Sequence, residues 1–431
     1  MIYFLIGQRG TGKTALLQRL KDYFQERIST FDLDERIATR ENSTIGQIFQ
    51  GKGETHFREL EKAGYFETLK EVQITKNPVV VSLGAGFDLE LLNPNSGQRC
   101  IWISRATDRA GRIFINRPRI RPELSSLQEF EQLSGERESR YRAIADLELS
   151  IPEGWNRPNE SEKKYFNALF FEDRLFSPDE TGTLTLSRQD ISRIPHLNRL
   201  GCRLEIRTDL LDSDTRSFFL KNIPHSRILY SIRTVLSADE LKNIPTSVQL
   251  DWAIESGVMP EVLKNHPALY SLSSHEASFE ELEKYQYACG VEKKLVLKYA
   301  PVVENFTELY LAPLWAMKAP RQRTFLPRGN GRWRWYRLLT RGQFPLQFIT
   351  EGISKQPDLP LILDWLRTPK CVTTFAAVVG NPVEHSLSPA THWDFSPFFA
   401  IQVGQSEKAE AYDVLEKLGL RYAAVTSPLK D

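Results

Sequence analysis

The sequence predicts an α/β protein of three successive segments: a parallel sheet with flanking helices, a (β/α)₈ barrel and a partial α/β domain. Three observations support this prediction. The apolar run 2–6 is followed at once by a glycine-rich loop and an amphipathic helix. From about 165 to 370, short apolar strands alternate with helical patterns. A further apolar strand at 372–379 opens the tail. The predicted boundaries are therefore 1–160, 165–370 and 371–431.

Composition limits the class of protein. The chain has 431 residues, of which 41% are hydrophobic and 26% charged, as expected for two or three globular domains. A net charge of +1 gives no strong field to attract nucleic acid or a membrane. No apolar stretch approaches the roughly 20 residues that span a bilayer, and the first residues carry no targeting signal. The four cysteines lack CxxC spacing. We expect a cytoplasmic protein with small-molecule substrates.

The glycine-rich loop is the strongest motif, because it reads Gly-x4-Gly-Lys-Thr between a strand and a helix. Glycines let the backbone wrap an anion, and the helix N-terminus adds its positive end. We expect Lys13 to reach the outer phosphates of ATP and the Thr14 hydroxyl to bind Mg²⁺. The predicted ATP-binding residues are Gly7, Gly10, Thr11, Gly12, Lys13, Thr14 and Ala15.

Charged residues follow the later elements of this segment. The strand 28–31 ends in Asp32 and Asp34, which lie two apart and are expected to face the same side, beside the loop. A second glycine turn, Gly84-Ala85-Gly86, follows a buried strand. The other predicted elements are a helix at 43–49, strands at 79–82 and 101–103, an arginine- and proline-rich mobile loop at 109–121, a helix at 137–145 and a linker at 151–162.

These motifs resemble shikimate kinase over the whole segment. The matching pieces are Asp32-x-Asp34, Gly53-Glu54-x-x-Phe57-Arg58, Gly84-Ala85-Gly86, Arg121-Pro122-Glu123-Leu124 and Arg137-x-x-x-Tyr141. The resemblance implies that Asp32 helps to hold Mg²⁺ and that Asp34 orients and deprotonates the shikimate hydroxyl. It implies that Arg58 and Arg137 pair with the shikimate carboxylate.

The resemblance also implies that Arg121 closes over ATP and the transferring phosphoryl group. It leaves open which of Arg109, Arg112 and Arg117 contacts the nucleotide. The turn at 84–86 would contact shikimate, and Ala85 departs from the glycine of the family. Its methyl would crowd the substrate if the backbone makes the contact.

In the second segment, polar residues close several predicted strands. In a (β/α)₈ barrel, residues at the strand C-termini are the catalytic candidates. Lys298 ends the apolar run 295–297, and burial there would lower its pKa and give a free amine that attacks a ketone. His275 is suited to proton transfer. The predicted strands are 168–171, 202–206, 227–232, 247–250, 269–272, 294–299, 315–318 and 345–349.

This segment resembles type I 3-dehydroquinate dehydratase. The matching pieces are Glu205-Ile206-Arg207, Ser231-Ile232-Arg233-Thr234, Ser274-His275-Glu276, Leu297-Lys298-Tyr299-Ala300, Trp333-Arg334 and Ser354-Lys355-Gln356-Pro357-Asp358. The resemblance implies a Schiff base on Lys298 with no cofactor, proton transfer by His275 and orientation by Glu205.

For substrate binding, the resemblance implies Arg207, Arg233, Arg334, Ser354 and Asp358 as dehydroquinate-binding residues. Trp333 and Asp358 depart from the family pattern, in which a serine and a glutamine occupy these positions. The segment 329–337, rich in tryptophan and arginine, fits either a reshaped lid or a basic aromatic patch, and the near-zero net charge favours the lid.

The tail resembles the start of shikimate dehydrogenase. Gly380-Asn381-Pro382 leads to Ser386 and Ser388, and Val425-Thr426-Ser427-Pro428-Leu429-Lys430 follows later. The resemblance implies carboxylate binding by the two serines and a role for Thr426 and Lys430 in hydride transfer. No Gly-x-Gly-x-x-Gly follows residue 371, so an NADP site is absent from this chain and we expect no dehydrogenase turnover.

Together the segments resemble the last three modules of the fungal AROM family of aromatic amino acid biosynthesis. We expect a multifunctional enzyme that uses ATP and Mg²⁺, and a homodimer is possible. A rival interpretation is a regulator that resembles fungal quinate repressors and acts by binding partners. A narrower rival is that only one module is active.

Overall fold

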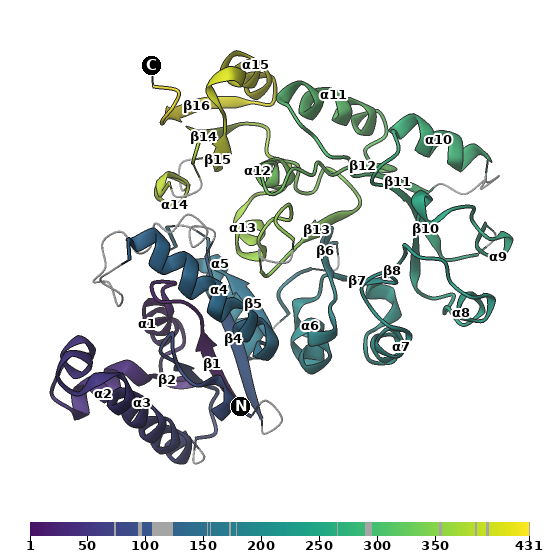
Figure 1. Cartoon of the computed structure of the whole chain (residues 1–431). Coiled ribbons are helices and arrows are strands. Elements are labelled where there is room, and N and C mark those ends of the chain that lie inside the picture. The colour runs from purple at the N-terminus through teal and green to yellow at the C-terminus, as the bar shows by residue number, and fades with distance from the viewer. Residues whose placement is uncertain are drawn as a thin grey trace. The chain divides into compact units, whose positions relative to one another are not determined.

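A computed structural model describes most of the chain and divides it into two compact units. The first unit contains residues 1–171 and 351–353, and the second contains 172–350 and 354–431 (Figure 1). The described residues are 1–72, 75–93, 97–105, 124–152, 154–155, 157–171, 174–177, 179–264, 266–288, 295–352, 356–383, 386–393 and 396–430. Over these residues, the structure has no helix with the length and apolar character needed to cross a membrane.

The first unit is built on a five-stranded parallel sheet with the order β2-β3-β1-β4-β5. The strands are β1 (Ile2–Ile6), β2 (Ser29–Asp32), β3 (Val79–Ser82), β4 (Gln98–Ser104) and β5 (Leu147–Ser150). The predicted bounds of β1 and β3 are confirmed, whereas β5 was not predicted. Because β1 is central, the loop that follows it lies at the C-terminal edge of the sheet, where ligands bind in such folds.

The helices of this unit are α1 (Lys13–Phe24), α2 (Leu33–Arg40), α3 (Ile45–Val72), α4 (Ser126–Ile144) and α5 (Glu160–Phe170), with short 3₁₀ turns at η1 (Gln25–Arg27) and η2 (Leu89–Leu91). The prediction that Asp32 and Asp34 share a strand end is wrong. Asp32 is the N-cap of α2, and its Oδ1 accepts hydrogen bonds from the backbone N–H groups of Asp34 and Glu35 at 3.1 and 3.3 Å. Because aspartate is favoured at the N-cap, α2 starts at Leu33, and Asp34 lies in its first turn.

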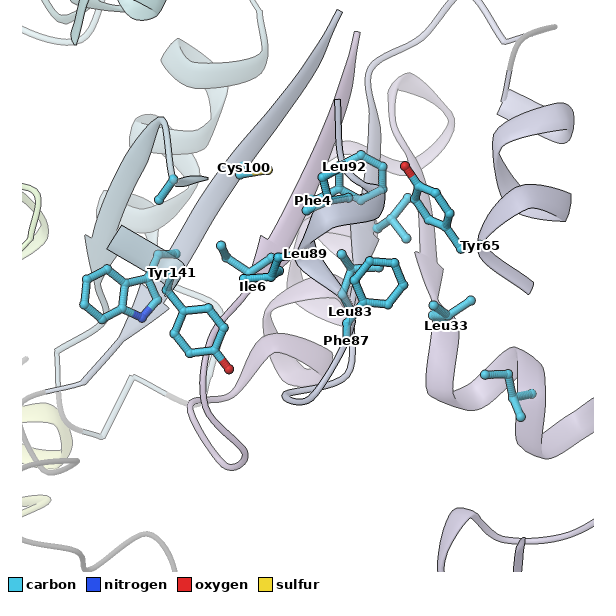
Figure 2. Close-up of a cluster of buried hydrophobic side chains, with 14 of the residues drawn as sticks. Phe4, Ile6, Leu33, Tyr65, Leu83, Phe87, Leu89, Leu92, Cys100 and Tyr141 are labelled. Atoms are coloured by element: carbon cyan, nitrogen blue, oxygen red, sulfur yellow. The ribbon is translucent and has the colours of Figure 1, made fainter. Parts of the chain in front are cut away.

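An apolar cluster fills the space between the sheet and the helices (Figure 2). Phe4 and Ile6 of β1 contribute to it, and both are almost fully buried. Two tyrosines at its margin bind loop carbonyls: the Tyr65 hydroxyl donates to Leu91 O at 3.1 Å and the Tyr141 hydroxyl to Ala85 O at 2.6 Å. The packing of α3 and α4 against the sheet therefore also fixes the loops that carry the site.

The first unit continues through α5, beyond the predicted boundary at 160. Arg19 of α1 forms a bidentate pair with Glu162 of α5, at 2.6 and 3.0 Å, and both side chains are almost completely buried. The Tyr23 hydroxyl also donates to Glu162, at 2.9 Å. Residues 160–162, predicted as linker, thus begin a helix that packs on α1, and the Asn159 side chain caps it.

Breaking this pair should destabilise the first unit. We expect Glu162→Ala to lower the free energy of unfolding by about 3–5 kcal/mol, because Arg19 becomes a buried cation without its partner. Denaturant unfolding of the full chain, followed by circular dichroism, measures the change. Arg40→Ala is the control, because the Arg40–Glu67 pair is about half exposed and should contribute less than about 1 kcal/mol. Equal effects of the two substitutions would contradict this assignment.

The second unit contains eight parallel strands in the order β12-β11-β10-β9-β8-β7-β6-β13. This sequential order matches a (β/α)₈ barrel, and no hydrogen-bonded pair joins β12 to β13 within the described residues. The strands are β6 (Gly182–Thr185), β7 (Arg203–Arg207), β8 (Ile228–Ile232), β9 (Gln249–Ala253), β10 (Leu269–Ser274), β11 (Val296–Tyr299), β12 (Arg323–Phe325) and β13 (Gln347–Ile349).

Two of the predicted barrel strands are wrong. Residues 168–170 form the end of α5 and 315–317 the end of α11, because a short apolar run does not by itself distinguish a strand from a helix. Strands β6 and β12 take their places.

The helices of the barrel follow the strands in order along the chain. They are α6 (Ile194–Leu200), α7 (Ser213–Asn222), α8 (Ala238–Lys242), α9 (Glu261–Lys264), α10 (Phe279–Ala288), α11 (Phe306–Met317), α12 (Arg334–Leu339) and α13 (Ile362–Arg367), with 3₁₀ turns η6 (Arg188–Arg193), η7 (His225–Arg227) and η8 (Ile254–Ser256).

The tail belongs to the same compact unit as the barrel. Its three-stranded parallel sheet has the order β15-β14-β16, and α15 packs on α11 of the barrel. Arg332 pairs with Glu407 at 2.5 Å, and the Trp335 and Phe375 rings lie in tilted contact with their centroids 6.1 Å apart. The elements are β14 (Phe375–Gly380), α14 (Ser388–His392), β15 (Phe398–Gln402), η9 (Gln405–Glu407), α15 (Lys408–Lys417) and β16 (Leu420–Val425).

Candidate active sites in the two units

The glycine-rich loop of the first unit makes tight backbone turns at its glycines. Gly7 and Gly12 adopt φ values of 143° and 92°, which side chains rarely accept. A Cβ on Gly12 would lie 2.8 Å from Nη2 of Arg105. Lys13 begins α1, and its ammonium donates to the carbonyl oxygens of Gly7 and Gln8 at 2.8 and 3.0 Å. The loop therefore has the strained geometry that brings N–H groups toward an anion.

Two oxygen ligands lie beside this loop. The Thr14 hydroxyl donates to Oδ2 of Asp32 at 2.7 Å, so α1 and the end of β2 present a hydroxyl and a carboxylate together. Within the described part of the chain, no group of three or more His, Cys, Asp and Glu side chains forms a metal cage. Such a sparse oxygen set fits Mg²⁺, which is usually held by one or two carboxylates together with substrate phosphates.

A pair of buried carboxylates lies next to this oxygen set. Oδ1 of Asp34 and Oε1 of Glu61 are buried and accept no hydrogen bond from any described residue. Both face the backbone of Gly84, where a Cβ would lie 3.1 Å from Asp34 and 2.6 Å from Glu61. Burial raises the pKa of Asp34, as does the nearby charge of Asp32. Burial also raises the pKa of Glu61, to about 7, against the attraction of Arg58.

Arg58 is held in place by two acids. Its guanidinium donates to Glu61 at 2.6 Å and to Glu54 at 3.0 Å. A Cβ on Gly86 would collide with this guanidinium, so the glycine turn and Arg58 share one small space. Sequence reasoning gave Glu61 no role. Its signal was the spacing of three residues from Arg58, which places both on one helix face.

The remaining predicted residues of this site that the structure describes lie beside the phosphate loop and in the glycine turn at 84–86. Arg137 of α4 donates to Oε1 of Gln8 at 3.4 Å, which places it beside the phosphate loop. Ala85 has no positive φ, and its carbonyl accepts the Tyr141 hydroxyl, so the backbone accepts alanine without strain. Arg121 and the loop 109–121 lie outside the described residues.

In the second unit, Lys298 is buried rather than exposed to bulk water. Its side chain is 1% exposed, and its ammonium donates to Oδ2 of Asp251 at 3.0 Å. It also lines a cavity of about 260 Å³ at the mouth of the barrel. The cavity is lined by Thr185, Glu205, Arg207, Arg233, His275, Lys298, Ala300, Leu326, Arg328, Arg337, Phe348, Gln356, Pro357, Asp358 and Leu359.

Asp251 is the fixed counter-ion of Lys298. On neighbouring strands Ser231, Asp251 and Ser271 share one register, so their side chains meet inside the barrel. Hydroxyls of Ser231, Ser271 and Ser273 donate to Asp251 at 3.2, 2.7 and 3.1 Å. Burial alone would raise the pKa of Asp251, but the nearby cations and hydroxyls lower it to about 2. Burial lowers the pKa of Lys298, against the attraction of Asp251.

His275 lies between a cation and an acid. Arg233 donates to its ring, at 2.8 Å to Nε2 and 3.1 Å to Nδ1, and Glu255 lies 3.9 Å from Nδ1. Glu255 Oε1 also accepts a hydrogen bond from the His275 backbone N–H at 2.6 Å, and this contact fixes the loop that follows β10. Burial lowers the pKa of His275 to about 4, and the nearby cations contribute to this shift. The imidazole is therefore neutral at pH 7 and able to accept a proton.

A pH dependence follows from this neutral imidazole. If this unit dehydrates 3-dehydroquinate, as the resemblance implies, and His275 accepts a proton during turnover, the rate should stay constant from pH 7 to about 5. It should fall at lower pH and reach half near the His275 pKa of about 4, because protonation removes the base. Initial rates by absorbance, with circular dichroism at each pH to confirm folding, measure the profile. A half-point near 6.5, the ordinary histidine value, would contradict it.

The structure brings most of the predicted barrel residues together. Glu205 accepts hydroxyls of Thr185 and Ser231 at 2.6 and 2.7 Å. Arg334, by contrast, is not a lining residue, because its guanidinium donates to Pro357 O at 2.7 and 2.9 Å. Ser354 lies outside the described residues. The predicted residues that line the cavity are Glu205, Arg207, Arg233, His275, Lys298 and Asp358.

The tryptophan- and arginine-rich segment 329–337 is not an exposed basic patch. Trp333 is fully buried and Trp335 nearly so, and the Trp333 indole donates to Val303 O at 2.7 Å. Asp358 fastens this segment through the backbone N–H groups of Gly329 and Gly331, at 2.9 and 2.7 Å. Sequence reasoning missed Asp251, which accepts a hydrogen bond from Lys298, and also Arg328 and Arg337, which line the cavity.

In the tail, the predicted residues lie in the segments that follow β14 and β16. Ser386 Oγ accepts the backbone N–H of Ser388 at 3.3 Å, and Thr426 N–H bonds Val379 O of β14 at 2.9 Å. A Cβ on Gly380 would collide with the Thr426 methyl. Lys430 is exposed. The glycine therefore lets the end of β14 approach Thr426.

The sheet order, the phosphate loop and the adjacent carboxylates of the first unit define a phosphate-loop phosphotransferase fold. A family model described as shikimate kinase matches residues 9–164. The shikimate kinase of Rhodopirellula baltica is 31% identical over 157 residues, which cover 34% of this chain and 79% of the relative. The chain belongs to the shikimate kinase family.

Two further matches come from Aquifex aeolicus. Its shikimate kinase is 31% identical over 160 residues, 35% of this chain and 86% of the relative. The crystal structure of that kinase matches with 32% identity over 35% of this chain and 86% of its own, with a TM-score of 0.28. The residues that the family model matches lie in the first unit.

Proposed function

We propose that the first unit transfers a phosphoryl group from ATP to a hydroxyl of shikimate. The observation that carries this is the juxtaposition of the Thr14–Asp32 pair with Asp34 and Glu61, both of which face Gly84. A phosphate site and a site for a hydroxylated carboxylic acid would thus share one edge of the sheet. Family membership supports the same reaction.

In this proposal, each side chain has a defined task. Lys13 and the loop N–H groups bind and orient the phosphates, and Thr14 and Asp32 would hold Mg²⁺, which neutralises charge on the phosphates when bound. Asp34 accepts the proton of the attacking hydroxyl, and its raised pKa makes it a better base near neutral pH. Arg58, fixed by Glu61, pairs with the shikimate carboxylate together with Arg137. Arg121 would stabilise the transferring group.

A coupled assay that follows ADP release tests this proposal. We expect ADP formation that depends on both shikimate and Mg²⁺, and shikimate 3-phosphate as the product by mass spectrometry. ATP consumption without a phosphorylated product would contradict the assigned acceptor.

We further propose that the barrel dehydrates 3-dehydroquinate through a Schiff base. The observation that carries this is a buried, cavity-lining lysine beside a neutral histidine. The Lys298 amine attacks the ketone, and loss of water from the adduct gives an iminium ion. His275 removes a proton from the adjacent carbon and then gives it to the ring hydroxyl, which leaves as water, and hydrolysis of the imine releases dehydroshikimate and the free Lys298 amine. Asp251 remains charged and stabilises the iminium.

Borohydride reduction in the presence of dehydroquinate tests the Schiff base. We expect one covalent adduct, mapped by mass spectrometry to Lys298. The two activities together would place the chain in aromatic amino acid biosynthesis. The rival interpretation, a regulator without catalysis, gains support from the departures at Ala85, Trp333 and Asp358. It predicts no turnover in either assay.

A further inference from the structure

Gln8 follows the first glycine of the phosphate loop, and both ends of its side-chain amide contact α4. The residue is 4% exposed. Its Nε2 donates to Leu133 O at 2.8 Å, and its Oε1 accepts a hydrogen bond from Nη1 of Arg137 at 3.4 Å. Because one neighbour is a carbonyl and the other a guanidinium, this orientation of the amide satisfies both. A buried glutamine therefore ties the phosphate loop to one turn of α4.

The main chain of Gln8 holds the phosphate-binding part of the loop. Its carbonyl oxygen accepts hydrogen bonds from the Lys13 ammonium and from the Thr11 hydroxyl, each at 3.0 Å. The backbone of this residue thus serves the groups proposed to bind phosphates, while its side chain serves α4. A displacement of Gln8 would be felt on both sides.

Helix α4 carries Arg137 between two loops of the site. Leu133, Arg137 and Tyr141 are spaced by four residues, so they lie along one face of the helix. The Tyr141 hydroxyl donates to Ala85 O of the glycine turn at 2.6 Å, and the Gln8 amide binds two turns earlier, at Leu133 O. Arg137 therefore lies between an anchor to the glycine turn and an anchor to the phosphate loop.

The contact between Gln8 and Arg137 orients the guanidinium without neutralising it. Its acceptor is a neutral amide, and its length of 3.4 Å exceeds that of an ordinary N–H···O bond. A carboxylate forms a stronger, charge-assisted bond with a guanidinium and can take its place. The shorter bond to Leu133 O remains when an acid binds, so the helix turn stays fixed.

We infer that Gln8 is a positioning residue, which sets the place of Arg137 relative to the phosphate loop and so aligns a carboxylic acid acceptor with the transferring phosphoryl group. The inference deepens the proposed kinase function and rests on it for the acceptor. Gln8 acts through Arg137 and needs no contact with either substrate. Phosphoryl transfer gains from such alignment, because it depends mainly on positioning and charge neutralisation.

The first test is the steady-state kinetics of the full chain, with shikimate and ATP varied separately. Gln8→Met keeps the length of the side chain but loses both hydrogen bonds. We expect it to raise the KM for shikimate about 10-fold and the KM for ATP less than about twofold, because only the acceptor side loses its anchor. Gln8→Asn should act in the same way, since its amide is one methylene too short to reach α4.

Gln18→Met is the matched control, because Gln18 is exposed on α1 and its amide donates to Asp22 at 2.9 Å instead of to α4. It should leave both KM values unchanged. A rise in the KM for ATP that equals or exceeds the rise for shikimate would overturn the inference, because the side chain would then only support the loop.

A second test needs no turnover. Phenylglyoxal labels arginine side chains, and peptide mass mapping gives the labelling rate at each position. Without substrates, we expect Gln8→Met to speed the labelling of Arg137 by about 3- to 10-fold, because the guanidinium loses the contact that orients it. The labelling of Arg40, which pairs with Glu67, should stay unchanged.

The two tests separate the possible failures. If the wild-type chain does not phosphorylate shikimate but Gln8→Met still speeds the labelling of Arg137, the proposed acceptor fails and the positioning role of Gln8 stands. If Arg137 is labelled at the same rate in both proteins, the inference is overturned, whatever the kinetics show.

Discussion

Replacing Lys298 with methionine is expected to abolish borohydride trapping and to lower the dehydratase rate by about 10⁴-fold or more. Methionine has a similar length but no amine, so it cannot form the iminium that makes the adjacent proton acidic. The buried position and the hydrogen bond to Asp251 explain why no other group replaces it. The absorbance of the conjugated product measures the rate, and mass spectrometry measures trapping.

The methionine variant also leaves Asp251 as a buried charge without its main partner, which is destabilising. Lys298→Arg keeps a cation beside Asp251 but cannot form an imine, so loss of activity in this variant reports chemistry rather than folding. Both variants should phosphorylate shikimate at the wild-type rate, because Lys298 belongs to the second compact unit. Retained dehydration in Lys298→Arg would contradict the proposed mechanism.

The parts of the fold that the sequence predicts best are those with a strong local signal. The bounds of β1 and β3 are predicted correctly, because each is a short apolar run followed at once by a glycine turn. Strand β6 was missed, because Gly182–Thr185 contains only one strongly apolar residue, Leu184. The boundary after α5 depends on the buried Arg19–Glu162 pair, and neither residue signals this contact in the local sequence.

In the candidate sites, residues at strand ends were predicted better than residues within strands. His275 and Lys298 follow apolar runs, and the structure places both at one cavity. Asp251 was missed because it lies within β9, although a carboxylate between Leu250 and Trp252 is itself a signal of a buried partner. Arg337 belongs to the segment interpreted as a lid and Arg328 directly precedes it, and only the structure shows that both line the cavity.

Replacing Lys13 with methionine is expected to lower the kinase rate by about 10³-fold, while dehydroquinate trapping on Lys298 stays at the wild-type level. The ammonium group lies against the loop carbonyl oxygens of Gly7 and Gln8, where we propose that the phosphates bind, and charge neutralisation is the main task in phosphoryl transfer. Thr14 and the loop N–H groups remain, so ATP affinity should fall less than the rate. A coupled assay with varied ATP separates the two effects.

Lys21→Met is the matched control for this substitution, because Lys21 lies in the last turn of the same helix and its side chain is exposed. It should keep the wild-type kinase rate. Together with Lys298→Arg, the Lys13 variant gives a double dissociation in which each substitution removes one activity and preserves the other. If the Lys13 variant lost both activities while its circular dichroism stayed unchanged, the two sites would not be independent. The assignment of one reaction to each compact unit would then fail.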